Sequence, residues 1–172
     1  MMMYKQYTQT LPTKSVILGI DPGYGRLGYA IFEKTETSEK LLDYSCVENP
    51  IHIEYSEKIL NIAKEIEKVI KKHKPNTLAI EKLYFTKNQK TALQVSEIRG
   101  IILYLAIKNK LKITEYTPLE VKLSVCGYGK ATKPQVEKMV KMLLKLKETP
   151  KYDDTTDAIA LCLTCVARND YF

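Results

Sequence analysis

The sequence has no apolar run long enough to cross a bilayer. The longest, Ile101 to Ile107, is far shorter than the roughly 20 residues that a membrane helix needs. Residues 1–15 are polar and lack the apolar core of a signal peptide, so we interpret them as a flexible leader. Residues 16–172 contain no repeat, low-complexity segment or linker and are predicted to form a single domain.

Cysteine is too scarce to form a disulfide framework. The chain has four cysteines in 172 residues, and a chain of this length can bury a core without crosslinks. Cys162 and Cys165 form a C-x-x-C pair, but the pair lies inside the apolar run Ala160–Val166. A redox or zinc role would need an exposed turn or a second pair, so both are predicted to be core residues of a cytoplasmic protein.

Positive charge is in excess. The net charge of +7 suits a polyanionic partner but does not prove one. The distribution of this charge says more, because the segment from Lys122 to Lys147 contains seven lysines and a single acid, Glu137. A basic segment beside an acidic cluster would fit a nuclease, in which lysines hold phosphates and carboxylates hold metal ions.

Hydrophobic periodicity predicts an antiparallel meander followed by alternating helices and strands. The expected strands are 16–21, 27–34, 41–48, 77–81 and 112–116. The expected helices are 54–74, 88–110, a short one after Pro118, one begun by the capping box Thr132-x-x-Gln135, and 153–167. This order predicts an α/β fold with a mixed five-stranded sheet, three antiparallel strands followed by parallel strands, and helices on both faces.

Four acids stand at the ends of these elements. Asp21 and Glu81 each close an apolar strand, and Asp154 and Asp157 open an apolar helix. A carboxylate at the end of a buried strand is costly unless something pairs with it. Strands one and four are expected to lie parallel and adjacent, so their ends should meet where ligands bind in open α/β sheets.

Residues three apart share one face of a helix, so Asp154 and Asp157 are expected to face the same site. A helix cap is the competing interpretation for Asp154, and Asp153 is its rival as a ligand. Oxygen ligands of this kind suit Mg²⁺, with Mn²⁺ as a substitute. Two such ions held by shared carboxylates are typical of phosphodiester cleavage.

Aromatic and basic residues near Glu81 are candidate nucleic-acid contacts. Tyr84 and Phe85 follow it in a polar loop that also contains Lys87, which suggests base stacking or insertion into a duplex for one of them and core packing for the other. The remaining candidates for phosphate contacts are Lys122, Lys130 and Lys133, and for each of these a solvated face is the alternative.

The helix around Ile101–Ile107 is apolar on every side and must be covered on both faces. A single helical layer on a small sheet could not cover both, so we infer a subunit interface. A fully buried central helix is the alternative.

Several motifs, in order, resemble the RuvC family of Holliday-junction resolvases. They are Ile17–Gly23 with Gly28-Tyr29, Ala79–Phe85 with Lys87-Asn88, Arg99-Gly100, Tyr116, Val121-Lys122, Val125-x-Gly127-x-Gly129, Lys133–Leu146 and Asp154–Ala160. The resemblance covers about 16–167. The chain departs from the family pattern at Tyr84, where phenylalanine is usual, at Asp154, where some members carry histidine, and in its leader.

The resemblance implies a ribonuclease H-like fold and a homodimer joined through the helix around Ile101–Ile107. It implies Mg²⁺-dependent paired nicks in four-way DNA junctions, during recombination and repair. It assigns catalytic and metal-binding roles to Asp21, Glu81, Asp154 and Asp157. Tyr84 takes the position of the aromatic residue that probes the junction, with Phe85 as its rival, and Lys122 and Lys133 take those of the basic contacts. A branch-migration complex of RuvA and RuvB is a further partner that it raises.

The mechanism expected from these residues is metal-assisted hydrolysis. Asp21 would bridge two ions, Glu81 and Asp157 would each hold one, and Asp154 would orient a ligand or water. Two alternatives stay open at this point: a nuclease of the same fold that acts on another nucleic acid, and a junction-binding protein without catalytic activity.

Overall fold

The first strand lies at the centre of the sheet. The computed structural model of the chain describes residues 14–82 and 89–171. Five strands follow the order β3-β2-β1-β4-β5, and their bounds are β1 Lys14–Asp21, β2 Arg26–Thr35, β3 Glu39–Glu48, β4 Thr77–Glu81 and β5 Lys112–Tyr116. β1 pairs antiparallel with β2 and parallel with β4, as predicted.

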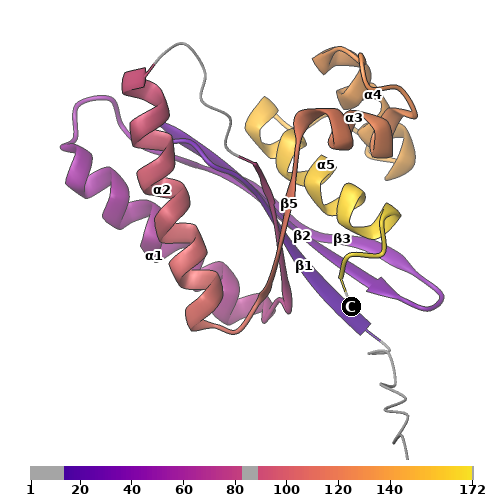
Figure 1. The fold of residues 1–172 in the computed structure, drawn as a ribbon, viewed down its shortest axis with the longest axis horizontal. Helices are drawn as coiled ribbons and strands as arrows, with labels where there is room; N and C mark the ends of the chain where they lie inside the picture. Colours follow the sequence, from indigo (N-terminus) through magenta and orange to yellow (C-terminus); the bar gives the residue numbers. More distant parts are fainter. Residues whose placement is uncertain (1–13, 83–88, 172) are drawn as a thin grey trace, which may run out of the picture.

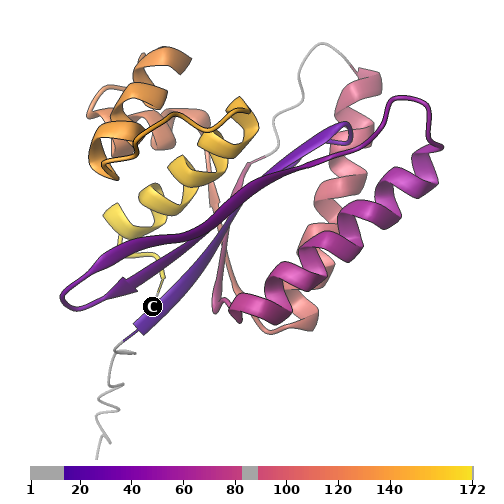
Figure 2. The ribbon, with the colours of Figure 1, turned by 180° about the vertical axis from the view of Figure 1, so that it is seen from behind.

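Helices cover both faces of this sheet. Their bounds are α1 Tyr55–His73, α2 Gln89–Lys108, α3 Pro118–Cys126, α4 Lys133–Leu143 and α5 Asp153–Ala167. α1 and α2 lie against one face, and α5 lies against the other with α3 and α4 outside it (Figures 1 and 2). The predicted mixed sheet with helices on both faces is therefore confirmed. No helix in the described part of the chain is both long and apolar enough to cross a membrane.

The first strand begins earlier than the sequence suggested. Lys14 and Ser15, assigned above to the leader, belong to β1, and Ser15 is 1% exposed. The Ser15 hydroxyl donates a hydrogen bond to the backbone oxygen of Tyr171 at 3.4 Å. Burial and this contact draw the polar serine into the strand, which corrects the predicted boundary; residues 1–13 lie outside the described residues.

Two glycines allow α5 to press against the sheet. A Cβ atom on Gly19 of β1 would lie 2.2 Å from the backbone oxygen of Ala158 and 2.6 Å from Cys162 Sγ. A Cβ atom on Gly28 of β2 would lie 1.9 Å from the backbone oxygen of Asp154. Real side chains do not come so close, so any larger residue here would force the helix away from the strands. The acids at the start of α5 owe their place to this close contact.

The two cysteines of the C-x-x-C pair are core residues. Cys162 and Cys165 are both 0% exposed on α5 and are free thiols. The Cys162 thiol donates to the backbone oxygen of Ala30 at 3.7 Å. Burial raises the pKa of both thiols, which keeps them protonated and unreactive.

Candidate active site

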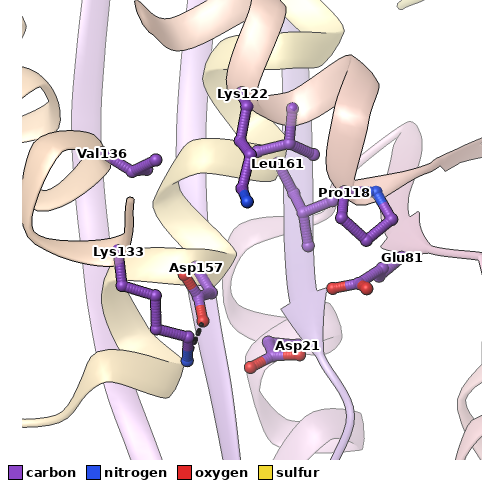
Figure 3. Close-up of a pocket in the computed structure, with 9 residues that line it drawn as sticks. Asp21, Glu81, Pro118, Lys122, Lys133, Val136, Asp157 and Leu161 are labelled. Carbon is purple, nitrogen blue, oxygen red and sulfur yellow. Dashed lines mark hydrogen bonds and ion pairs between the residues drawn. The ribbon is translucent and has the colours of Figure 1, made fainter. Parts of the chain in front are cut away.

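Three of the predicted acids face one cavity. Ile20 and Ile80 are partners in the parallel pairing of β1 with β4, so Asp21 and Glu81, one residue later on each strand, meet at the same edge of the sheet. Asp157 reaches the same place from the first part of α5 (Figure 3). The cavity has a volume of about 370 Å³.

Apolar side chains and two lysines form the rest of the cavity wall. Pro118 and Val121 of α3, Val136 of α4 and Leu161 of α5 line it together with Lys122 and Lys133. Figure 3 shows Lys122 and Lys133 extending toward the acids from two different helices. A wall of this kind limits water around the acids while leaving cations at its rim.

Burial, together with the neighbouring negative charges, makes the charged form of these acids unfavourable. Burial, followed by the charges of Asp157 and Glu81, raises the pKa of Asp21 to about 8. Burial also raises the pKa of Glu81, and Asp157 adds to this rise. The pKa of Asp157 is raised by burial and lowered in part by Lys133. A cavity that holds three such acids favours the arrival of positive charge.

Lys133 supplies part of that charge. Its Nζ lies 3.2 Å from Oδ2 of Asp157 and 3.2 Å from Oδ2 of Asp153. Burial opposes its charge, but the two aspartates prevail and raise the pKa of Lys133 to about 12. The hydrogen bond from Lys133 in turn lowers the pKa of Asp153.

Asp154 lies to one side of the other acids, which corrects the expectation that it shares their cavity. It lines a neighbouring cavity of about 420 Å³, and its Oδ2 is 3.1 Å from Arg26 Nε. The two groups form an ion pair without a hydrogen bond, and this buried oxygen has no hydrogen-bond donor among the described residues. Asp154 nevertheless acts on the site, because its charge helps to raise the pKa of Asp21.

Asp153, the rival ligand, is more exposed than Asp154. The exposed fraction of its side chain is 57%, against 22% for Asp154. The charge of Asp154 is one of the main causes that raise the pKa of Asp21. Position and electrostatics therefore favour Asp154 over Asp153 as the fourth acid.

The acids do not enclose a ready-made metal site. Among residues 14–82 and 89–171, no group of three or more acidic, cysteine or histidine side chains stands close enough to hold a metal ion. The donor set still fits a hard cation, because three carboxylates of raised pKa face the same cavity. Lys133 is paired with Asp157, so a cation bound by Asp157 would compete with that pair.

The predicted nucleic-acid contacts divide into three groups. Lys122 and Lys133 line the cavity, as described above. Lys130 is exposed in the loop between α3 and α4 and does not line the cavity. Tyr84, Phe85 and Lys87 lie outside the described residues.

Two arginines that contact the acids were given no role from the sequence. Arg26, at the start of β2, pairs with Asp154 and Asp153. Arg99, on α2, donates from Nε to the backbone oxygen of Glu81 at 3.3 Å and pairs with Glu115. A clue to Arg99 was present in the sequence, because a cation between Ile98 and Ile101 on an apolar helix needs buried partners. The clue to Arg26 was its place directly after the Asp-Pro-Gly turn.

The family description that matches this chain is "Crossover junction endodeoxyribonuclease RuvC", over residues 17–165. The chain belongs to the RuvC family. The family resemblance drawn from the sequence motifs is confirmed, and so is the prediction that the protein is a nuclease.

Curated RuvC proteins match most of the chain. The crossover junction endodeoxyribonuclease RuvC of Petrotoga mobilis is 47% identical over 145 residues, which cover 84% of this chain and 89% of that protein. The RuvC of Halothermothrix orenii is 45% identical over 148 residues, which cover 86% of this chain and 90% of that protein.

Solved RuvC structures share the fold. Thermus thermophilus RuvC in complex with Holliday junction substrate superposes with a TM-score of 0.83 at 29% identity, covering 90% of this chain and 94% of that one. The yeast mitochondrial Holliday junction resolvase, at 16% identity and a TM-score of 0.65, covers 95% of this chain and 82% of that one and is similar in fold alone. The ribonuclease H-like fold predicted from the resemblance is confirmed.

Proposed function

We propose that the protein resolves four-way DNA junctions by cutting two strands of like polarity with symmetric paired nicks. The observation that carries this proposal is the meeting of Asp21, Glu81 and Asp157 in one cavity with Lys122 and Lys133 at its wall. Family membership supplies the substrate class, because relatives are named crossover junction endodeoxyribonucleases.

A divalent metal ion is the cofactor that this donor set favours. We assign its binding to Asp21, Glu81 and Asp157, with Asp154 as the fourth acid, and we propose two Mg²⁺ ions per site, with Mn²⁺ as a substitute. The chemistry that Mg²⁺ supplies when bound is a lower pKa for the attacking water and compensation of the charge on the leaving 3′ oxygen. The protein's own contribution is to hold the acids at the edge of the sheet and to limit bulk water with the apolar wall.

The lysines supply affinity for the phosphate backbone. Lys122 and Lys133 stand at the cavity, where they can hold the phosphates on either side of the bond to be cut. Lys130 is exposed and suited to a contact farther along an arm of the junction. Contacts of this kind weaken with salt, so binding should be tighter at low ionic strength.

A homodimer would place two such sites at a fixed separation. α2 buries Ile102 and Ala106 against the sheet, but Leu93, Tyr104 and Ile107 are 63%, 62% and 66% exposed. The structure thus excludes a fully buried central helix within the single chain. Leu93, Gly100, Tyr104 and Ile107 follow each other at spacings of seven, four and three residues, which places them along one side of the helix. We propose that this stripe is the dimer interface.

The RuvA and RuvB complex and the cytoplasmic location rest on the family resemblance and the absence of sequence signals. Both stay predictions.

The test is cleavage of a synthetic four-way junction with and without Mg²⁺. Replacing Asp21 with asparagine keeps the side chain's shape but removes its charge, and we expect cutting to fall by about 10²- to 10³-fold, as when a preorganised charge-stabilising group is lost. Junction binding, measured by gel shift, should be retained because the lysines are intact.

Asp43→Asn is the matched control. Asp43 lies on β3, pairs with Lys72 and His73, and has no contact with the cavity, so the variant should cut normally. Normal cutting by Asp21→Asn, or equal cutting of linear duplex and junction by the wild type, would overturn the proposed function.

A further inference from the structure

Asp153 bridges two cations with two different oxygens. Its Oδ2 lies 3.2 Å from Lys133 Nζ, and its Oδ1 lies 3.6 Å from Arg26 Nη2. The helix that contains Asp153 also carries both neighbouring acids of the site. Asp153 itself lines neither the cavity of Asp157 nor that of Asp154.

Each of these cations is shared with an acid assigned above to the metal. Lys133 is as close to Asp157 as to Asp153, at 3.2 Å in both cases. Arg26 is 3.1 Å from Asp154 Oδ2 and 3.6 Å from Asp153 Oδ1. The same arrangement therefore occurs twice: a cationic side chain lies between Asp153 and an acid that is proposed to bind metal.

A shared cation competes with a divalent ion for the same carboxylate. If the cation has only the metal-binding acid as a partner, an incoming ion must break that pair and release the side chain into solvent. If a second acid holds the cation, the ion can take the first carboxylate while the cation moves a short distance and stays paired. Asp153 provides that second acid for Lys133 and for Arg26.

The position of Lys133 after this exchange also matters for DNA. Lys133 lines the cavity, and a lysine retained at its rim can contact a phosphate there. Arg26 has a further anchor, because its guanidinium lies 5.3 Å from the centre of the Tyr152 ring. Both cations can thus remain near the site when the acids change partner.

We propose that Asp153 is a positioning residue of the metal site, which holds Lys133 and Arg26 so that a divalent ion can displace them from Asp157 and Asp154. The inference rests on the proposed metal-dependent function. Asp153 lies outside the proposed set of metal ligands and acts through Lys133 and Arg26.

The experiment measures binding of Mg²⁺ alone to the full-length protein by isothermal titration calorimetry. In Asp153→Asn, both cations depend on the metal-binding acids, so the dissociation constant for Mg²⁺ should rise by about threefold to fivefold, the range expected for an exposed ion pair. The apparent Mg²⁺ requirement for junction cutting should rise by a similar factor, whereas the melting temperature should change little because the pairs are at the surface.

Loss of a nearby negative charge could weaken Mg²⁺ binding without any role for the cations, so the same substitution is repeated in a Lys133→Met/Arg26→Met background. If Asp153 acts through the two cations, its effect there should fall to within about twofold. The single backgrounds Lys133→Met and Arg26→Met serve if the combined variant does not fold, and each should reduce the effect by about half.

An unchanged dissociation constant in Asp153→Asn, or an equal effect in every background, would overturn the inference. Neither result touches the proposed function as long as the wild type binds Mg²⁺ and cuts junctions. A wild type that does neither would overturn the proposed function itself.

Discussion

α2 and α5 have similar apolar sequences but different surroundings. On α5, every residue from Ala158 to Val166 is buried, since the sheet covers one side and α3 and α4 cover much of the other. On α2, the sheet and α1 cover one side, and Tyr104 and Ile107 remain exposed. An apolar helix must be buried on both sides. Its sequence does not say whether the second side is buried by its own chain or by another.

The difference also separates the roles of the two helices. α5 is fixed in place by the chain itself and carries acids that must sit within a few ångströms of β1. Among the described residues, α2 meets the site through Arg99, which donates to the backbone oxygen of Glu81, and through Val95, which lines the cavity of Asp154. A helix with an open side can join two subunits without disturbing the acids.

The largest effect is expected from shortening a buried isoleucine on α5. Ile159 is 0% exposed, whereas Ile107 on α2 is 66% exposed, so the two positions form a matched pair. Ile159→Ala should lower the free energy of unfolding by about 2–5 kcal/mol because it leaves a cavity. Ile107→Ala should change it by less than about 1 kcal/mol when urea unfolding is measured at protein concentrations that favour the monomer. Equal losses would show that the two helices are equally covered within one chain.

The next largest effect should come from a charge on the exposed side of α2. Tyr104→Glu would bury a carboxylate at the proposed interface, and we expect the dimer dissociation constant to rise by about 30-fold, or about 2 kcal/mol. Sedimentation equilibrium measures this shift. Leu143→Glu is the control, since Leu143 is 54% exposed on α4, and α4 lies on the opposite face of the sheet from α2 (Figure 1). A wild type that sediments as a monomer at all concentrations would contradict the proposed interface.

The last expected effect concerns the carboxylate of Asp21. The pKa of Asp21 is raised from 3.8 to about 8, so in the absence of metal the folded protein binds this proton more tightly than the unfolded chain does. Stability from this group is therefore fully present below pH 3.8 and is lost as the pH rises toward 8. Asp21→Asn removes that loss, and at pH 8 we expect a gain of at least about 1 kcal/mol, or about 2–4 °C in Tm.

Thermal unfolding of wild type and Asp21→Asn in a chelator, at pH 5 and pH 8, measures this difference. The advantage of the variant should be greater at pH 8 than at pH 5. An advantage that does not depend on pH would mean that the pKa of Asp21 is not raised in the folded protein.

Most of the fold could be predicted because its signals are local. Apolar runs that end at Asp21 and Glu81 predicted two strands. The meeting of the two acids followed from placing these strands parallel and adjacent, because the carboxyl ends of parallel strands lie at one edge of a sheet. The capping box at Thr132 correctly placed the start of α4, where the Gln135 side chain accepts from the Thr132 backbone N–H at 2.8 Å.

The offset of Asp154 could not be predicted, because it depends on contacts between distant segments. Spacing alone put Asp154 and Asp157 on one helical face. The structure shows that the first turn of α5 lies against Gly28 and next to Arg26, which draws Asp154 toward the β1–β2 hairpin while Asp157 faces the cavity. No local pattern encodes which side of a hairpin a helix will meet.

The spread of the acids along the chain has a consequence for synthesis in the cell. Translation proceeds from the amino to the carboxyl end, so Asp21 and Glu81 leave the ribosome well before Asp157 exists. Until α5 emerges, its face of the sheet lacks both a cover and the third acid. Under the proposed roles of these acids, we expect a nascent chain to be unable to cut DNA until that helix docks.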